Sequence, residues 1–348
     1  MCSSTLSTKG GIISVVRNYL SNNSWKEHKF IHVATHLDTN KFILLLFFGI
    51  SYLKVILITL FTHYKIAHLH TSERGSFWRK HLILNTLKMF GKKVILHHHG
   101  AEFDLFFENC SSRQQRKIIK TLEKADMNIV LSERLINMIK SKAPQAKVSV
   151  LYNAVNTYST IPYNPDARNI LFLGRLGQRK GTYDLLKSIK LLDDIIDKDI
   201  QFYLCGDGNI EGVRQKVSEL NIEHRIAHIG WISGPQKNNI LQNSMINVLP
   251  SYNEGLPMTI LETMAYGIPN ISTNIASIPE VIKHDINGFL IQPGDIEALT
   301  QSLKELISNK TLRLSFSKAS YDMIMNNFSL DAKIEQLESI YNQLELPQ

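Results

Sequence analysis

Short apolar runs rich in β-branched residues alternate with amphipathic stretches through the second half of the chain. The runs, which we expect to form strands, are Ile170–Gly174, Gln201–Cys205, Ile226–Ile229, Ile246–Leu249, Pro269–Ser272 and Gly288–Ile291. Stretches with a helical period follow at Tyr183–Leu192, Gly212–Leu220, Gln236–Gln242 and Thr259–Tyr266. Such alternation is typical of a parallel sheet with crossover helices, so it predicts a doubly wound α/β domain.

The first half repeats this pattern less regularly. Strands are expected at Phe30–Ala34, Ile66–His70, Val94–His98, Asn128–Leu131 and Val148–Leu151. We therefore predict two Rossmann-like α/β domains, over residues 1–155 and 156–325, with a junction near Asn153–Pro165 where prolines interrupt the periodic pattern. A C-terminal helix is expected over 326–348, and one option is that it packs back toward the N-terminal domain.

One segment departs from the simple pattern. Phe42–Phe61 is almost wholly apolar, with Lys54 as its only charge, and it approaches the roughly 20 residues that a membrane span needs. A span would place the strands on its two sides on opposite faces of a bilayer, although one sheet needs both. Three alternatives remain: a span, a helix partly exposed to lipid, and a buried crossover helix, which we favour.

Composition and charge narrow the class of protein. With 348 residues, 44% hydrophobic and 20% charged, the chain fits a folded protein of two domains. Three cysteines are too few for a disulfide framework, and the polar N-terminus does not resemble a secretory signal, so we expect a cytoplasmic location. Residues 1–150 carry 22 Lys and Arg against 9 Asp and Glu. Because the basic residues are spread beside an apolar segment, an anionic inner-membrane surface is the expected partner, not nucleic acid.

The strongest chemical pattern follows the strand that ends near Pro250. Gly255, Leu256 and Pro257 stand at the expected start of a helix, where Pro257 suits the first helical position. A helix N-terminus at the carboxyl end of a parallel strand favours a phosphate group. Glu254 and Glu262 lie on either side of that anion site, and their carboxylates can accept hydrogen bonds from sugar hydroxyls. A nucleotide sugar has hydroxyls on both sides of a diphosphate.

A second pattern follows the strand Ile170–Gly174. Gly174 allows a ligand to approach the backbone, and Arg175 and Lys180 supply positive charge at the carboxyl end of another strand. These two cations would balance a diphosphate.

These two patterns together resemble the retaining glycosyltransferases of family four. Further motifs in the family's order are Gly206-Asp207-Gly208, Gly230-Trp231, Pro279-Glu280-Val281-Ile282 and Asn287-Gly288-Phe289. The resemblance is dense from about Leu151 to Gly294 and thinner before it. It implies the GT-B fold, in which two doubly wound domains face each other across a cleft.

The resemblance also assigns roles to residues. Glu262 would hold the ribose, Glu254 the transferred sugar, and Arg175 and Lys180 the diphosphate. In the first half, Gly10-Gly11 before the helix Ile12–Leu20 resembles the family's glycine loop near the donor phosphates, and His99 resembles its active-site histidine. The first strand, which should precede Gly10, would then be clipped or would lie upstream of the given sequence.

The implied activity is transfer of a sugar, with retention of anomeric configuration and without a cofactor or metal, to a glycan acceptor that is expected to be lipid-linked. The expected setting is bacterial surface polysaccharide synthesis, such as O-antigen or capsule, on the cytoplasmic side of the inner membrane. The alternatives are a nucleotide-sugar epimerase, a phosphorylase of the same fold, or a non-catalytic membrane-associated subunit. His97 and His99 share one face of a strand, but spacing shows no further metal ligands, so a zinc site is not favoured.

Overall fold

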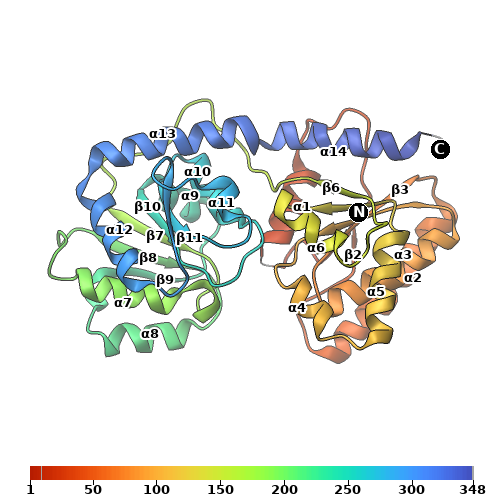
Figure 1. Ribbon diagram of the computed structural model, residues 1–348, viewed down its shortest axis with the longest axis horizontal. Helices are drawn as coiled ribbons and strands as arrows, with labels where there is room; N and C mark the ends of the chain where they lie inside the picture. The colour runs from red at the N-terminus through yellow and green to blue at the C-terminus, as the bar shows by residue number, and fades with distance from the viewer. Residues whose placement is uncertain (9, 347–348) are drawn as a thin grey trace. The chain divides into compact units, whose positions relative to one another are not determined.

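A computed structural model describes residues 1–8 and 10–346 of the chain, in two compact units (Figure 1). The first unit comprises Met1–Ala154 and the chain from Leu330 onward, and the second comprises Val155–Ser329. Each unit has its own sheet of six strands, and every strand pair in both sheets is parallel. The expected fold class, two Rossmann-like α/β domains of the GT-B type, is confirmed.

The sheet of the first unit has the strand order β2-β1-β3-β4-β5-β6. Its strands are β1 (Cys2–Ser3), β2 (Val33–Ala34), β3 (Ile66–Thr71), β4 (Lys93–His98), β5 (Met127–Val130) and β6 (Val148–Val150). Its helices are α1 (Gly11–Ser21), α2 (Lys41–Phe61), α3 (Gly75–Met89), α4 (Phe103–Glu108), α5 (Ser112–Lys124), α6 (Ile136–Lys140) and α14 (Leu330–Glu345).

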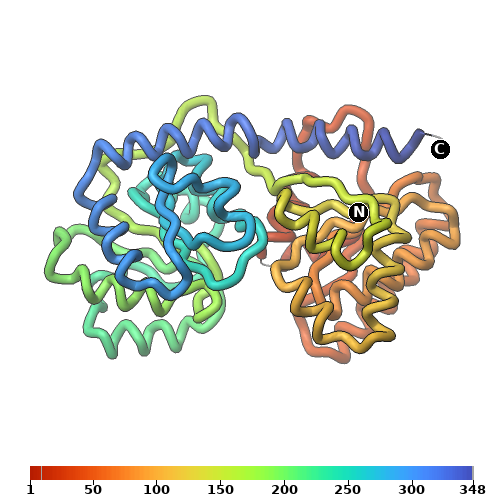
Figure 2. The backbone as a smooth tube through the Cα atoms, viewed as in Figure 1, coloured from red at the N-terminus to blue at the C-terminus, as the bar shows by residue number. Residues whose placement is uncertain are grey.

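The last helix, α14, packs against the beginning of the chain. Figure 2 shows this blue C-terminal helix beside the red and orange segment that follows α1. Asp331 accepts hydrogen bonds from Asn22 and Ser24, at 3.1 and 2.6 Å, and Glu338 accepts one from the backbone N–H of Lys26 at 2.8 Å. These contacts hold α14 against the rest of the first unit.

The sheet of the second unit has the order β12-β11-β10-β7-β8-β9, which is the strand order of the dinucleotide-binding Rossmann fold. Its strands are β7 (Asn169–Leu173), β8 (Gln201–Cys205), β9 (Ile226–Gly230), β10 (Ser244–Leu249), β11 (Asn270–Thr273) and β12 (Gly288–Ile291). Its helices are α7 (Thr182–Leu192), α8 (Ile210–Glu219), α9 (Gly234–Gln242), α10 (Met258–Ala265), α11 (Ile278–Val281), α12 (Ile296–Ser308) and α13 (Lys310–Asn327).

For the first sheet, one expectation is confirmed and another needs correction. A clipped first strand, one of the two alternatives, precedes the glycine loop: β1 is only Cys2–Ser3, yet it lies between β2 and β3 and pairs with both. The strand expected at Phe30–Ala34 is shorter, because only Val33 and Ala34 pair with β1. Apolar pattern alone therefore overestimates β2, whose length is limited by its two-residue partner.

The apolar run forms α2, but the expected burial of this crossover helix is wrong. Only Ser51, Val55 and Thr59 of this helix are buried, and Val55 packs in the core that includes Leu69 and Leu84. The most apolar stretch of the helix has a mean hydropathy of 2.4 and is only 17% buried. The strands β2 and β3, on either side of α2 in the chain, both pair with β1, so α2 lies along this sheet as a crossover helix.

Candidate functional site

The point where the strand order of the second sheet reverses lies between β7 and β10. These strands are neighbours, with Leu171 opposite Asn247, although β8 and β9 lie between them in the sequence. In open parallel sheets, ligands bind beyond the carboxyl ends of the strands at such a reversal. The loop from Gly174 follows β7 and the loop from Pro250 follows β10, so both predicted motifs meet there.

Two glycines allow these loops to approach closely. A Cβ on Gly181 would lie 2.0 Å from the carbonyl oxygen of Pro250, and Gly181 has a φ of +72°, which disfavours any other residue. A Cβ on Gly208 would lie 2.3 Å from the carbonyl oxygen of Leu176. Because Gly181 has no side chain, the loop after β7 can contact the loop after β10. In the same way, Gly208 lets the loop after β8 contact the loop after β7.

Lys180 and Glu254 form an ion pair in this region. Glu254 is buried, with 6% of its side chain exposed, and Lys180 is largely buried, at 14%. Glu254 also accepts a hydrogen bond from the Ser251 hydroxyl at 2.7 Å. Burial lowers the pKa of Lys180, and the nearby Glu254 carboxylate partly opposes that shift. The ammonium has three N–H donors, so the bond to Glu254 leaves others for a ligand.

Arg175 is an exposed cation of the site. It follows Gly174 directly, and its side-chain Cγ lies 2.9 Å from the position a Cβ would take on Gly208. Within residues 1–8 and 10–346, no carboxylate lies within 4 Å of its guanidinium. Lys180 thus has an acidic partner, whereas the charge of Arg175 is open to an anionic ligand.

The loop after β10 leads into α10. Gly255, Leu256 and Pro257 precede the helix, and Pro257 has an extended backbone and caps it, so the first helical residue is Met258. This corrects the expected position of Pro257 by one residue. Its missing N–H costs nothing there, because the first N–H groups of a helix have no partner within the helix. The N–H groups of α10 therefore lie at the strand reversal, where they favour an anion.

Glu262 lies within α10 and has a partner that the sequence does not suggest. Lys237, from α9, donates to the Glu262 carboxylate at 2.7 Å. Both side chains are partly exposed, at 28% for Lys237 and 23% for Glu262, so the carboxylate remains accessible.

A second contact also escapes sequence reasoning. The Tyr252 hydroxyl donates to Asp184 at 2.7 Å, which links the loop after β10 to α7. In addition, the N–H of Tyr252 donates to the carbonyl of Arg179 at 2.9 Å. These bonds hold the two loops together and so help to place Lys180 beside Glu254.

The other predicted residues, Gly11 and His99, belong to the first unit. Gly11 opens α1 after Gly10, whose φ of 133° is accessible mainly to glycine. His99 directly follows β4, and its N–H donates to the carbonyl of Thr71 at 2.8 Å, which extends the pairing of β3 with β4. Both residues therefore lie at the carboxyl edge of the first sheet.

His99 belongs to a group of stacked histidines, His68, His70, His97 and His99, which we call the histidine ladder. The rings of His70 and His99 are joined by a nitrogen–nitrogen contact of 2.8 Å, and those of His68 and His97 by one of 3.1 Å. The two pairs stack, with centroids 4.4 Å apart for His68 and His70 and 4.3 Å for His97 and His99. Sequence reasoning singled out only the β4 residues, because the β3 partners lie 29 positions earlier.

Burial keeps this ladder neutral. It lowers the pKa of His99 to about 3 and that of the neighbouring His98 to about 4, and it holds the pKa values of His68, His70 and His97 well below the ordinary value. A neutral His99 can exchange hydrogen bonds with a sugar hydroxyl but adds no positive charge. The cations of the predicted site are therefore Arg175 and Lys180.

The ladder is also the one place where the described residues group three histidine ligand atoms. Those of His68, His70 and His97 lie within 4.8 Å of one another. Two of the nitrogens already bond to each other, because His68 Nε2 faces His97 Nδ1. Two other nitrogens of the ladder, His70 Nε2 and His97 Nε2, are buried without a hydrogen-bond partner among the described residues.

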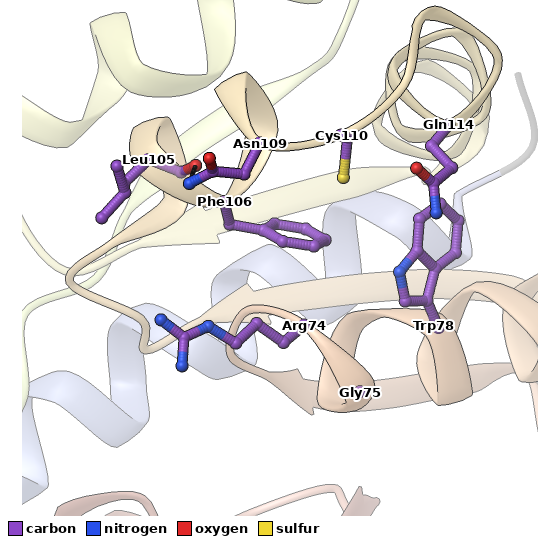
Figure 3. Close-up of a pocket in the computed structure, with 8 residues that line it drawn as sticks. All are labelled: Arg74, Gly75, Trp78, Leu105, Phe106, Asn109, Cys110 and Gln114. Carbon is purple, nitrogen blue, oxygen red and sulfur yellow. Dashed lines mark hydrogen bonds between the residues drawn. The ribbon is translucent and has the colours of Figure 1, made fainter.

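A separate pocket lies in the first unit, among α3, α4 and the start of α5. It has a volume of about 270 Å³, and Figure 3 shows the side chains that line it, including Trp78, Phe106 and Cys110. None of the predicted site residues is among those lining it. Arg74 at this pocket is paired with Glu102 at 3.1 Å.

Comparison with known proteins concerns chiefly the second unit. Residues 160–323 match the family described as Glycosyl transferases group 1. The second unit is therefore similar to that family over most of its length. The match contains Arg175, Lys180, Glu254 and Glu262, which are the residues that carried the sequence prediction.

The whole chain has the fold of a known two-unit structure and more limited similarity to named enzymes. Sucrose-phosphate synthase from Thermosynechococcus elongatus superposes with a TM-score of 0.79 at 17% identity, over 99% of this chain and 98% of that one. The lipopolysaccharide 1,6-galactosyltransferase of Salmonella typhimurium is 32% identical over 224 residues, which are 61% of this chain and 60% of that enzyme. The Escherichia coli UDP-Gal:alpha-D-GlcNAc-diphosphoundecaprenol alpha-1,3-galactosyltransferase is 24% identical over 310 residues, 80% of this chain and 75% of that enzyme.

Proposed function

We propose that this protein is a retaining glycosyltransferase that moves a sugar from a nucleoside-diphosphate sugar to a glycan acceptor. The observation that carries the proposal is the position of Lys180, Glu254 and Arg175 at the strand reversal, beside the N-terminus of α10. Two cations and free helical N–H groups suit a diphosphate, and two carboxylates suit the hydroxyls of the sugars on its two sides.

Each residue has a distinct task in this proposal. Arg175 and the free N–H donors of Lys180 bind the diphosphate, and Glu262 accepts hydrogen bonds from the ribose hydroxyls. Glu254 binds the transferred sugar and also holds the Lys180 ammonium in place. The roles that the resemblance gives to His99 and Gly11, both in the first unit, stay predictions from the sequence.

Transfer then breaks the bond between the anomeric carbon and the diphosphate oxygen, and the bonding electrons leave with the diphosphate. Arg175, Lys180 and the α10 N–H groups stabilise that developing charge, so the step needs no bound metal. The acceptor hydroxyl attacks the same face of an oxocarbenium-like centre. Its proton passes to the departing phosphate oxygen, so the step needs no side-chain base.

The relatives support a narrower setting. The similar Salmonella enzyme is named for lipopolysaccharide, and the E. coli enzyme for a UDP-galactose donor and a diphosphoundecaprenol acceptor. We propose a uridine nucleotide donor and a lipid-linked glycan acceptor for this chain, in bacterial surface polysaccharide synthesis at the cytoplasmic face of the inner membrane.

Product analysis tests the proposal against its alternatives. Purified protein is incubated with UDP-galactose, UDP-glucose, UDP-N-acetylglucosamine and the GDP sugars, with and without a lipid-linked glycan, and the products are followed by NMR. Transfer predicts nucleoside diphosphate and a new α-linked glycan from an α-linked donor. A changed nucleotide sugar would instead show an epimerase, a sugar phosphate formed only with inorganic phosphate would show a phosphorylase, and no reaction would favour a non-catalytic subunit.

A further inference from the structure

The polarity of α2 is inverted relative to a helix on the surface of a water-soluble protein. Apart from Lys41 and Lys54, its outward side chains are apolar: Phe42, Ile43, Leu45, Leu46, Ile50, Leu53, Leu57, Leu60 and Phe61 are between 45% and 78% exposed. In contrast, its polar side chains Ser51 and Thr59 are buried, and Tyr52 is partly buried against the core. An amphipathic helix on the surface of a soluble protein instead turns its apolar side chains toward the core and its polar side chains toward water.

The inward polar groups are all satisfied. The Ser51 hydroxyl donates to the carbonyl of Phe47 at 2.8 Å, and that of Thr59 donates to Val55 at 2.7 Å and contacts the Tyr64 hydroxyl at 2.6 Å. The Tyr52 hydroxyl contacts that of Thr86 on α3. The bonds of Thr59 to Tyr64 and of Tyr52 to Thr86 join the inner face to groups outside the helix, so another rotation of α2 about its axis would break them.

The helix that neighbours α2 also exposes apolar side chains. The next helix, α3, lies beside α2 in Figure 1 and contacts it, and it exposes Leu82 and Met89. Phe90, at its end, is also exposed. Single exposed apolar residues are ordinary on a protein surface. A row of them along a whole helix of 21 residues is typical of a surface that binds an apolar partner.

Charge around this surface indicates which partner it binds. Between Asp38 and Glu102, the sequence contains one acidic residue, Glu73, and nine Lys and Arg. Lys41 and Lys54 are exposed, and neither has an acidic partner within residues 1–8 and 10–346. An apolar face that carries the unpaired Lys41 and Lys54 matches the acyl and headgroup regions of an anionic bilayer.

We propose that α2 lies in the plane of an anionic membrane, with its outer apolar face among the acyl chains and Lys41 and Lys54 at the lipid headgroups. A lysine stem can extend along apolar surface to reach a headgroup. The helix does not span the bilayer, because β2 and β3 pair with the same strand and the inner face of α2 packs on the core through Val55. This role is separate from the proposed transfer chemistry.

Cosedimentation with lipid vesicles tests the proposal. The vesicles contain phosphatidylcholine alone or mixed with phosphatidylglycerol, and binding is measured at low and high salt. The test variant replaces three outer residues, Ile50→Gln, Leu53→Gln and Leu57→Gln. The matched control replaces three exposed apolar residues of the second unit, Leu191→Gln, Ile195→Gln and Leu314→Gln, which are 46% to 56% exposed.

We expect the wild type and the control to bind the anionic vesicles, and the α2 variant to bind them at least about tenfold more weakly. A second variant, Lys41→Ala with Lys54→Ala, should lose the preference for anionic over neutral lipid while keeping its circular dichroism spectrum. Equal binding by the α2 variant and the control would overturn the proposal. A dimer of the wild type in the absence of vesicles, converted to a monomer by the α2 substitutions, would also overturn the proposal. A second copy of the chain would then cover this face.

Discussion

The Lys180 ammonium pairs with the Glu254 carboxylate across 74 positions of sequence. They meet because β7 and β10 are neighbours in the sheet, and Gly181 lets the loop after β7 contact Pro250 directly. Both side chains are largely removed from water, so the removal of one leaves an unpaired buried charge on the other.

This pairing predicts different effects for the two cations. Lys180→Ala should lower the transfer rate by about 10² and also destabilise the protein by about 3 kcal/mol, because Glu254 would be buried without a partner. Arg175→Ala should lower the rate by about 10² but change the free energy of unfolding by less than about 0.5 kcal/mol, because Arg175 is exposed. Steady-state kinetics and urea unfolding of both variants check this. An equal loss of stability in both would contradict the assigned burial.

The two glutamates should separate binding from turnover. Glu262→Ala should raise the KM for the donor with little change in kcat, because the ribose is held throughout the reaction. Glu254→Ala should mainly lower kcat, because it contacts the reacting sugar and positions Lys180. Lys237→Ala serves as the control, since it removes the partner of Glu262 without removing the carboxylate. Wild-type kinetics in both glutamate variants would refute these roles.

Much of the second unit can be predicted from sequence because local pattern and tertiary structure agree there. The strands β8 and β12 begin and end where the apolar runs do. The glycines and charges that follow the strands also indicate a phosphate site, because the ends of parallel strands meet at one edge of a sheet. The Lys180–Glu254 pair could not be predicted, since it depends on the approach of two loops.

The first unit was harder to predict for physical reasons. An apolar run predicts a helix at α2, but hydropathy does not say which side of a helix meets the core and which side meets the surroundings. The histidine ladder depends on the register that places His70 opposite His97 in neighbouring strands. Without knowledge of that register, the sequence does not predict that His68 and His70 lie beside His97 and His99.

The ladder predicts a pH dependence of stability. Burial holds the pKa values of its histidines below the value of about 6.5 in the unfolded chain, so below pH 6.5 the unfolded state takes up protons that the folded state does not. The free energy of unfolding should therefore fall as the pH decreases from 6.5 to 5, by up to about 1.4 kcal/mol per pH unit for each histidine. Between pH 7.5 and 8.5, these histidines should change the free energy of unfolding very little, because they are neutral in both the folded and the unfolded state.

Urea unfolding at a series of pH values measures this dependence. His70→Asn, which removes one buried imidazole, should reduce the slope between pH 6.5 and 5 relative to the wild type. His63→Asn is the control, because His63 is exposed and outside the ladder. A wild-type slope in the His70 variant, or stability that rises on acidification, would show that the ladder is not held neutral.

Chelation of divalent metal ions tests whether the site stabilises the charge of the departing diphosphate without a bound metal. EDTA should leave the transfer rate unchanged, because Arg175, Lys180 and the α10 N–H groups supply the stabilising charge. The control adds magnesium or manganese to chelated protein, which should give no increase beyond the untreated rate. Loss of activity in EDTA with recovery in manganese would contradict the proposed step.

The most direct test of the central claim is acceptor-dependent release of UDP from a UDP sugar, measured for the wild type, Lys180→Ala and the remote surface variant Lys216→Ala. Lys216 is paired only with Glu219 on its own helix among the described residues, so it matches the change of charge without touching the site. We predict UDP release by the wild type and Lys216→Ala only when a glycan acceptor is present, and a rate about 10² lower for Lys180→Ala. Equal rates in all three proteins, or no release with any donor and acceptor, would contradict a glycosyltransferase site at the reversal between β7 and β10.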